Sequence, residues 1–356
     1  MKPGALIKGK VEDLAFGGEG ILKIDGAVIF VPYVIPGEEV EVSIVQAKKS
    51  FYRAKLVRVL EPSPSRVEPV CPYFGICGGC QYQHIDYTVE RNFKEKQLSD
   101  LLQRVGQIAS PDIRPMHFSQ PYNYRNRITV HQEHGRVGFR DINGQNLVDI
   151  KECAIASREV NKKLEKLRQS NPRRPHYSVR ANAVAGEAFH QTNQLMGKVL
   201  LERVCSAVSE GVDSLLEGYA GVGFFTHELA KRIPEIIAIE SNFKAVEEAK
   251  KAPESAKVKW VSGTVEEHFP HLRAQLKGSR VVCLLDPPRE GLSEIVRRDL
   301  LDMSFEKIVY LSCNPATLAR DLKALRAKWE PEFFETLDMF PRTAHLECLT
   351  GLKPKV

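Results

Sequence analysis

Hydrophobic and polar positions follow two different patterns along this chain. In the first 60 residues, short apolar or alternating stretches, at 28–32 and 39–44, lie between glycine-containing turns, a pattern that indicates short β-strands. From about residue 181 to residue 356, apolar strand-like runs alternate with segments of helical spacing. This alternation is typical of a doubly wound parallel α/β sheet.

The α/β region is expected to contain five parallel strands, at 214–217, 236–239, 258–261, 281–285 and 308–311. Helices are expected over 198–208, 225–232 and 242–251, and after each of the last two strands. The chain then ends in a pair of strands, at 333–337 and 346–349.

The region between these two has features of its own. Residues 87–105 have helical spacing and end at Gly106, and strands are expected over 127–139 and 145–150. Residues 171–177 form a basic loop, for which a phosphate contact and a plain surface loop are both open. We therefore expect three domains: a small barrel of the oligonucleotide-binding type with five strands over 1–60, a central α+β domain over 61–180, and a Rossmann-like domain over 181–356.

Composition narrows the class of protein. Of the 356 residues 43% are hydrophobic and 27% are charged, with a net charge of +6, as in a folded globular protein with a mild preference for polyanions. No apolar run reaches membrane-spanning length and the N-terminus leads into no signal-peptide core, so we expect a cytoplasmic protein without membrane contact. Lysines and aromatics in 48–55 suit RNA, although a solvated strand edge explains them equally.

A glycine-rich turn follows the first strand of the α/β region. Gly218, Gly221 and Gly223 have the spacing G-x-x-G-x-G, which differs from that of a dinucleotide site. Glu240 ends the next strand, where a carboxylate can bind both hydroxyls of a ribose. The pattern favours a nucleoside ligand without pyrophosphate, such as S-adenosylmethionine; a tight turn with a helix-capping acid is the alternative.

Two further strands end in reactive side chains. Asp286 follows the strand 281–285, Cys313 follows the strand 308–311, and Glu347 lies on the terminal pair of strands. A thiolate that adds to C6 of a pyrimidine makes C5 nucleophilic enough to attack a methyl sulfonium, and a base must then remove the C5 proton. The set of a thiol, a carboxylate and a methyl-donor site predicts this chemistry.

Three of the eight cysteines lie within ten residues. Cys71, Cys77 and Cys80 have the spacing C-x5-C-x2-C, and Cys153 is the best candidate for a fourth ligand. Four thiolates can hold zinc or a [4Fe–4S] cluster, and the three-plus-one spacing favours the cluster. Cys205 and Cys283 are expected in the core, and Cys348 is unassigned.

Four motifs together resemble the signature of the RNA uracil-5-methyltransferases: Phe189–Asn193, Asp286–Arg289, Ser312–Pro315 and His345–Glu347. The N-terminal unit resembles the TRAM domain of that family, and the cysteine pattern resembles its cluster-bearing members. The resemblance implies that Cys313 is the nucleophile and Glu347 the base. It also implies that Gln191, Tyr219, Glu240 and Asp286 lie at the S-adenosylmethionine site, although Gln191 and Asp286 are alternatively uracil contacts.

The resemblance also implies an RNA partner, and we infer no obligate protein partner from the sequence. The expected target is 23S ribosomal RNA, with transfer RNA as the alternative. Two other functions are possible for such a chain: an inactive RNA-binding or assembly protein, and a redox sensor that acts through the cysteines. The catalytic motifs are intact, which disfavours the first, and nothing in the sequence requires the second.

Overall fold

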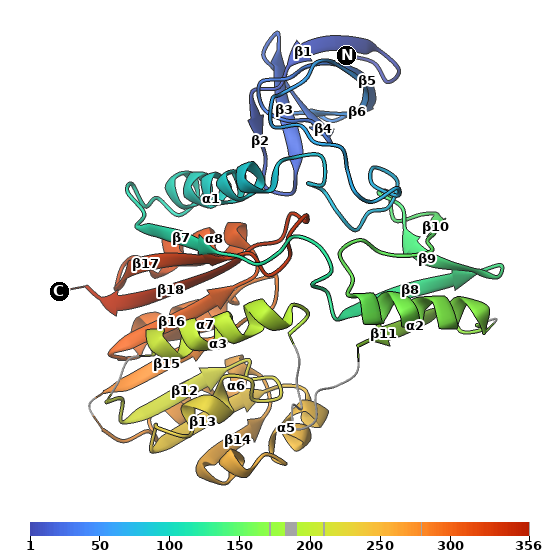
Figure 1. Ribbon diagram of the computed structural model, residues 1–356. Coiled ribbons are helices and arrows are strands. Elements are labelled where there is room, and N and C mark those ends of the chain that lie inside the picture. Colours follow the sequence, from blue (N-terminus) through green and yellow to red (C-terminus); the bar gives the residue numbers. More distant parts are fainter. Residues whose placement is uncertain (171, 182–190, 209–210, 279, 356) are drawn as a thin grey trace. The chain divides into compact units, whose positions relative to one another are not determined.

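The computed structural model describes residues 1–170, 172–181, 191–208, 211–278 and 280–355, and it divides into two compact units (Figure 1). Unit 1 comprises Met1–Gln97, Gln120–Asn182 and Phe340–His345. Unit 2 comprises Leu98–Ser119, Ala183–Met339 and Leu346–Val356. The expected barrel and most of the expected central domain lie in unit 1, whereas Leu98–Ser119 of that central domain and the α/β sheet lie in unit 2.

The N-terminal part of unit 1 is a sheet of six strands, one more than the sequence predicts. They are β1 (Leu6–Lys10), β2 (Asp13–Leu14), β3 (Glu19–Ile24), β4 (Ala27–Pro32), β5 (Glu39–Ala47) and β6 (Tyr52–Glu61), in the order β1-β5-β6-β4-β3-β2. The alternation in β5 has a direct structural cause, because Val40, Val42 and Ile44 point into the core of this sheet.

The central part of unit 1 holds a second sheet, of order β10-β9-β8-β11. Its strands are β8 (Arg127–Glu133), β9 (Arg136–Arg140), β10 (Leu147–Asp149) and β11 (His176–Arg180), and α2 (Arg158–Gln169) packs on its apolar face. The predicted single strand over 127–139 is wrong: it is the β8–β9 hairpin, which turns at His134 and Gly135, both with positive φ. Helix α2 is absent from the prediction, whereas α1 (Tyr87–Arg104) confirms the helix expected over 87–105.

Unit 2 is built on an eight-stranded sheet of order β14-β13-β12-β15-β16-β18-β17-β7. The strands are β7 (Ile113–His117), β12 (Ser214–Gly218), β13 (Glu235–Glu240), β14 (Val258–Ser262), β15 (Val281–Leu285), β16 (Lys307–Ser312), β17 (Trp329–Leu337) and β18 (Glu347–Pro354). Strand β18 is antiparallel to both of its neighbours, and every other pairing is parallel. The five predicted parallel strands and the closing pair are confirmed; β7 is an addition.

Helices flank this sheet (Figure 1). They are α3 (Gln194–Ala207), α4 (Thr226–Leu229), α5 (Phe243–Ala249), the 3-10 helix η1 (Pro253–Lys257), α6 (Val265–Arg273), α7 (Glu294–Asp302) and α8 (Pro315–Leu325). Apolar residues of α6, α7 and α8 share one core with Leu216, Cys283 and Tyr310 of the central strands. In the described part of the chain, no helix is long and apolar enough to cross a membrane.

The strand order reverses between β12 and β15. The chain runs from β12 outward through β13 to β14 and then returns to β15 on the other side of β12. In open α/β sheets, ligands bind beyond the carboxyl ends of the strands at such a reversal. The fold therefore directs attention to the residues that follow β12, β13, β15 and β16.

Candidate active site and cysteine cavity

Three of the predicted cofactor residues lie at one level of the sheet. Gly218, the last residue of β12, pairs with Ile239 of β13 and with Leu285 of β15. The residue after each of these is Tyr219 after Gly218, Glu240 after Ile239, and Asp286 after Leu285. Parallel strands in register therefore bring these three side chains to the same edge of the sheet, as the sequence predicts.

The glycine-rich turn is held by the Glu240 carboxylate. Its Oε2 accepts a hydrogen bond from the Gly221 amide (2.9 Å), and its Oε1 accepts one from the Asn242 amide (2.6 Å). Gly221 has φ +58°, and no heavy atom lies within 4 Å of the position where its Cβ would stand. Oε1 also accepts a hydrogen bond from Ser241 Oγ (3.3 Å), so the remaining accepting capacity is on Oε2. The turn is thus closed on the Glu240 side and open beside Gly221.

Gln191 and Gly223 line a second part of the same region. Both face a cavity of about 790 Å³ that His227 also lines. Gly223 has φ +84°, and a Cβ there would lie 2.6 Å from the His227 ring, so this position requires glycine. Phe189 and His190 of the predicted motif lie outside the described residues.

Cys313 and Glu347 are brought together by the β16–β18 ladder. Strands β16 and β18 are antiparallel, and Leu311 pairs with Leu349 and Ser312 with Cys348. Continued by one step, this register places Cys313 opposite Glu347. Both side chains are half-buried. The two residues are distant in the chain, and only the strand register makes them neighbours.

The charges around the thiol are mainly acidic. Burial raises the pKa of Cys313 to about 11, the carboxylates of Glu347 and Asp286 contribute to the rise, and Arg289 opposes it. Burial also raises the pKa of Glu347 to about 8, with Asp286 adding to this and Arg289 opposing it, and it raises the pKa of Asp286 to about 7. The thiol and both carboxyl groups are therefore largely protonated below neutral pH.

Sequence reasoning gave no role to two charged groups of this region, Glu217 and Arg289. Glu217 is the one charged residue in β12; burial raises its pKa to about 8, while a hydrogen bond from Thr226 Oγ1 (2.7 Å) opposes the rise. An acid within an otherwise apolar strand is the signal that could have identified it. Arg289 lies in a recognised motif, but only the structure shows that its charge acts on both Cys313 and Glu347.

The loop that follows β15 is fixed to α8, the helix that starts two residues after Cys313. The Leu292 amide donates to Asp321 Oδ2 (2.8 Å), and Arg320 Nη2 donates to the Glu290 carbonyl (2.8 Å). A Cβ on Gly291, whose φ is +73°, would lie 2.5 Å from Asp321 Oδ2. Asp321 is fully buried. We call this set of contacts the α8 clamp.

Two side chains at the start of α8 extend the clamp. Asn314 Nδ2 and Thr317 Oγ1 both donate to the carbonyl of Arg289, at 3.0 and 3.2 Å. Asn314 also caps the helix, since its side chain accepts from the Ala316 amide. The segment that carries Cys313 and the loop that carries Arg289 are therefore held together by direct hydrogen bonds.

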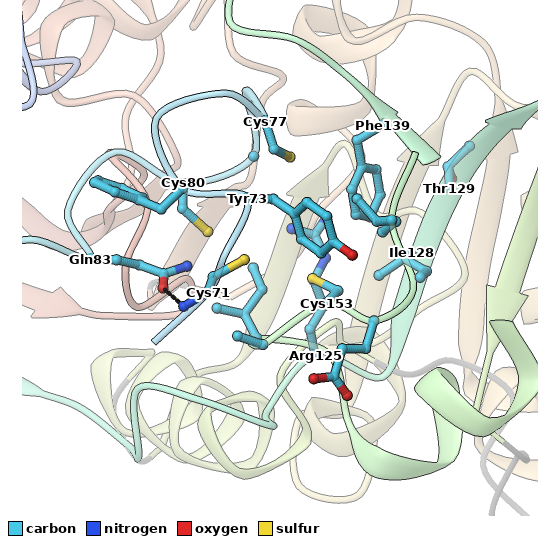
Figure 2. Close-up of a pocket in the computed structure, with 16 residues that line it drawn as sticks. Cys71, Tyr73, Cys77, Cys80, Gln83, Arg125, Ile128, Thr129, Phe139 and Cys153 are labelled. Atoms are coloured by element: carbon cyan, nitrogen blue, oxygen red, sulfur yellow. Dashed lines mark hydrogen bonds between the residues drawn. The ribbon is translucent and has the colours of Figure 1, made fainter. Parts of the chain in front are cut away.

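The four predicted ligand cysteines line one cavity in unit 1. Cys71, Cys77 and Cys80 face Cys153 across a cavity of about 230 Å³ (Figure 2). Burial raises the pKa of Cys77 to about 11 and that of Cys80 to about 12, and the neighbouring thiols raise both further. The set of donors is all sulfur, which fits a metal cluster. As placed in the described part of the chain, no three His, Cys, Asp or Glu side chains form a group that could hold a metal ion, so support for a cluster comes from the all-sulfur donors around one cavity.

Backbone hydrogen bonds shape the two loops that carry these cysteines. The Cys71 amide donates to Gln83 Oε1 (3.1 Å), and the Cys77 amide donates to the Tyr73 carbonyl (2.9 Å). On the other loop, the Cys153 amide donates to Asn161 Oδ1 (2.9 Å), a residue of α2. The cavity is thus built by hydrogen bonds among the described residues.

The remaining cysteines have simpler surroundings. Cys283 is fully buried in the sheet, which confirms the prediction, and Cys205 is only half-buried on α3. Cys348, unassigned from the sequence, is fully buried and pairs with Ser312 in the ladder.

Comparison with known protein families gives two matches. A model described as tRNA (Uracil-5-)-methyltransferase matches residues 171–355, more than half of the chain. A model described as tRNA (uracil(54)-C(5))-methyltransferase, TRAM domain, matches residues 7–65. The second match covers the six-stranded sheet of unit 1.

Whole-length relatives agree with these matches. An uncharacterised RNA methyltransferase of Bdellovibrio bacteriovorus is 30% identical, over 98% of this chain and 95% of its own. Another, from Halalkalibacterium halodurans, is 27% identical over 97% of this chain and 96% of its own. The crystal structure of a Pyrococcus abyssi tRNA (uracil-54, C5)-methyltransferase with S-adenosyl-L-homocysteine has the same fold, with a TM-score of 0.72. Its sequence is 24% identical, and the match covers 97% of this chain and 100% of that one.

Proposed function

The chain belongs to the tRNA (uracil-5-)-methyltransferase family, and from this premise we propose that it methylates C5 of a uridine in RNA. The observation that carries the proposal is the β16–β18 register, which sets Cys313 opposite Glu347, next to the strand β15 that Asp286 follows. A thiol, a base and a cofactor edge at one end of a sheet are what this reaction requires.

In the proposed mechanism, Cys313 acts as the nucleophile. Its thiolate forms a bond to C6 of the uracil, and the C5–C6 π electrons move toward C5 and the C4 carbonyl. When bound, S-adenosylmethionine would supply an electrophilic methyl group to C5, and its sulfur would keep the electron pair of the broken S–CH3 bond and leave as the thioether S-adenosylhomocysteine. Glu347 then accepts the C5 proton, the C5–C6 double bond re-forms, and the Cys313 thiolate leaves.

The raised pKa of the Cys313 thiol gives Arg289 a role. Because the pKa of the thiol is raised to about 11 by burial and by carboxylates, it must lose a proton before it can attack. Arg289 opposes this rise, as the cationic sulfonium of the bound donor also would. We therefore assign Arg289 to the stabilisation of the thiolate.

The donor site is proposed at the reversal point of the sheet. Glu240 would bind the ribose hydroxyls, and the open side of Gly221 would admit the nucleoside. Tyr219 lies between Glu240 and Asp286 at the same level of the sheet. Gln191 and Gly223 line the adjoining cavity. Gln191 and Asp286 are each assigned to either the donor or the uracil.

Two RNA classes are candidates for the substrate. The prediction of 23S ribosomal RNA stays a prediction. Transfer RNA is favoured by the descriptions of both matching family models and by the substrate named for the similar solved structure. The TRAM match supports RNA binding and does not distinguish the two.

Deletion of the gene is expected to remove 5-methyluridine from one specific position. The measurement is mass-spectrometric mapping of nuclease fragments from separated ribosomal and transfer RNA, with and without the gene. Complementation with the wild-type gene should restore the modification. Unchanged 5-methyluridine in both RNA pools would contradict the proposed function, and the pool that changes identifies the substrate.

We further propose that Cys71, Cys77, Cys80 and Cys153 hold a [4Fe–4S] cluster. Four thiols from two loops surround a cavity of about 230 Å³, which leaves room for a polynuclear group at its centre. The cluster would serve as a structural crosslink between residues 71–80 and the loop at Cys153, and no catalytic step depends on it. Zinc is the alternative.

Replacement of Cys153 by alanine is expected to remove iron and sulfide from anaerobically purified protein. The variant should lose visible absorption and unfold at a lower temperature, because the cluster no longer joins the two loops. Cys205→Ala is the matched control, because Cys205 lies on α3 outside the cavity. Wild-type protein that contains one zinc per chain and no iron would contradict the cluster.

A further inference from the structure

The free face of the β10-β9-β8-β11 sheet in unit 1 is polar and basic. In the β8–β11 ladder, Arg127 pairs with Arg180, Thr129 with Ser178, and His131 with His176. Residues directly opposite each other in an antiparallel ladder project from the same face. We call these six residues the basic face. Arg127, Thr129, Ser178 and Arg180 are exposed. The intervening Ile128, Val130 and Val179 are buried.

The other face of this sheet is covered. Val160 and Leu164 of α2 pack against Ile128 and Val130 in a shared core. The hydrophobic requirement of the sheet is therefore met by α2, and the basic face is not needed for the core. Thr129 also lines the cysteine cavity, so the basic face and that cavity adjoin.

The Arg127–Arg180 pair is unfavourable for folding. Like charges directly opposite each other destabilise an antiparallel ladder. Ser178 nevertheless holds both guanidiniums in place, because its Oγ accepts from Arg127 Nε (3.1 Å) and from Arg180 Nε (3.2 Å). Among the residues that the structure describes, each guanidinium binds this hydroxyl through Nε alone, which leaves its two terminal NH2 groups to meet another acceptor.

A third arginine adds to the same charge. Arg125 Nε donates a hydrogen bond to the Arg127 carbonyl (3.0 Å). The pKa of Arg127 is lowered mainly by its partial burial, and the positive charges of Arg180 and Arg125 lower it further. In the part of the chain that the structure describes, none of these three guanidiniums forms an ion pair with a carboxylate. Three adjacent cations without an internal counter-ion fit an external anion.

The loop that enters β11 continues the positive charge. Arg173 and Arg174 are exposed, and their amides donate to the Tyr177 hydroxyl at 2.8 and 2.7 Å. Tyr177 thereby orders the loop at the end of the basic face where His176 lies. The positive charge therefore extends from this loop along β11 to Arg180, over the length of several residues of an extended strand.

We propose that the basic face binds the phosphate backbone of the RNA substrate, as a docking surface separate from the Cys313 site. Guanidinium, hydroxyl and imidazole groups are the side chains that contact phosphate oxygens, and paired guanidiniums suit them best. The identification of the anion as RNA rests on the proposed function. The unfavourable Arg127–Arg180 pair is retained because the RNA supplies the counter-charge.

Arg180→Glu is the most informative variant, because it separates RNA binding from stability. It replaces a like-charge pair by an ion pair between Arg127 and the introduced carboxylate, so the melting temperature at low salt should stay equal or rise. Binding of a fluorescein-labelled single-stranded RNA to the full-length protein should weaken about tenfold or more. The slope of log K against log salt should become shallower by about 0.7 for each phosphate that the protein no longer neutralises.

Lys166→Glu is the matched control. Lys166 is exposed on α2, the helix that covers the opposite face of the same sheet, and the change in net charge is identical. This variant should bind RNA within about twofold of wild type. With RNA that the wild type methylates, Arg180→Glu should raise KM and leave kcat unchanged.

Two outcomes would overturn the basic face. One is an Arg180→Glu protein that binds RNA with wild-type affinity and salt slope. The other is equal weakening in Arg180→Glu and Lys166→Glu, which would show only a general charge effect. Wild-type protein that binds RNA but forms no 5-methyluridine would contradict the proposed function. The test of the basic face would still be decisive in that case, because it measures RNA binding directly.

Discussion

Cys313→Ala is expected to abolish methyl transfer, with a loss in rate of at least about 10⁴-fold, because the variant lacks the thiolate that forms the proposed bond to C6. The same variant should fail to capture RNA that contains 5-fluorouridine. With fluorine at C5 there is no C5 proton for the base to remove. After methyl transfer, the wild-type enzyme should therefore remain covalently bound to such RNA through the Cys313 sulfur. The complex is measured as a band of reduced mobility on a denaturing gel, and it requires S-adenosylmethionine.

The control for this experiment is Cys205→Ala, which removes a half-buried thiol from α3 and should trap RNA like the wild type. A Cys313→Ala protein that still forms the denaturation-resistant complex would refute the assignment of the nucleophile. Retention of the fold is checked by the melting temperature, which this small change at a strand end should alter little.

Glu347→Gln is expected to stop the reaction after methyl transfer. The glutamine cannot accept the C5 proton, so methylated RNA should accumulate as a covalent adduct even with ordinary uridine, and turnover should fall by about 10²–10⁴-fold. The measurement is retention of labelled methyl in a denaturing gel band. In the wild type, kcat should rise with pH through about 8, where Glu347 ionises in the structure.

Stability gives a second readout for the same variant. The pKa of Glu347 is raised in the folded state, so its contribution to stability is present below the unfolded pKa and is lost as pH rises through about 8. The glutamine variant lacks this loss and should gain in melting temperature relative to wild type between about pH 5 and about pH 9. Glu330→Gln, at a β17 side chain that is 43% exposed, is the control, and wild-type turnover by Glu347→Gln would exclude Glu347 as the base.

Much of the fold could be predicted because the parallel strands of unit 2 are buried on both faces and therefore read as continuous apolar runs. Strand β7 could not, since Ile-Arg-Pro-Met-His contains a proline and polar residues and becomes a strand only by pairing with β17, which lies far away in the chain. Helix α2 was missed although Ser157 caps it, and the β8–β9 hairpin was missed because its turn is only two residues long.

The candidate site was predictable where it follows strand ends. Asp286 and Cys313 stand directly after apolar runs, so their position at the edge of the sheet follows from the chain alone. The pairing of Cys313 with Glu347 depends on the antiparallel register of β18, which no local pattern encodes. The same holds for Asp321, whose contacts with Leu292 and Tyr310 join three separate segments.

The α8 clamp fixes the arrangement of the thiol segment and the acidic loop when the chain folds. Hydrogen bonds from α8 hold the loop between Asp286 and Leu292, and Gly291 fits there only because it has no side chain. The relative position of the thiol segment and the acidic loop is therefore set once, during folding. In the proposed reaction, each cycle would begin with that entropy already removed, and the free energy of RNA binding would be available for drawing the uridine out of its stack.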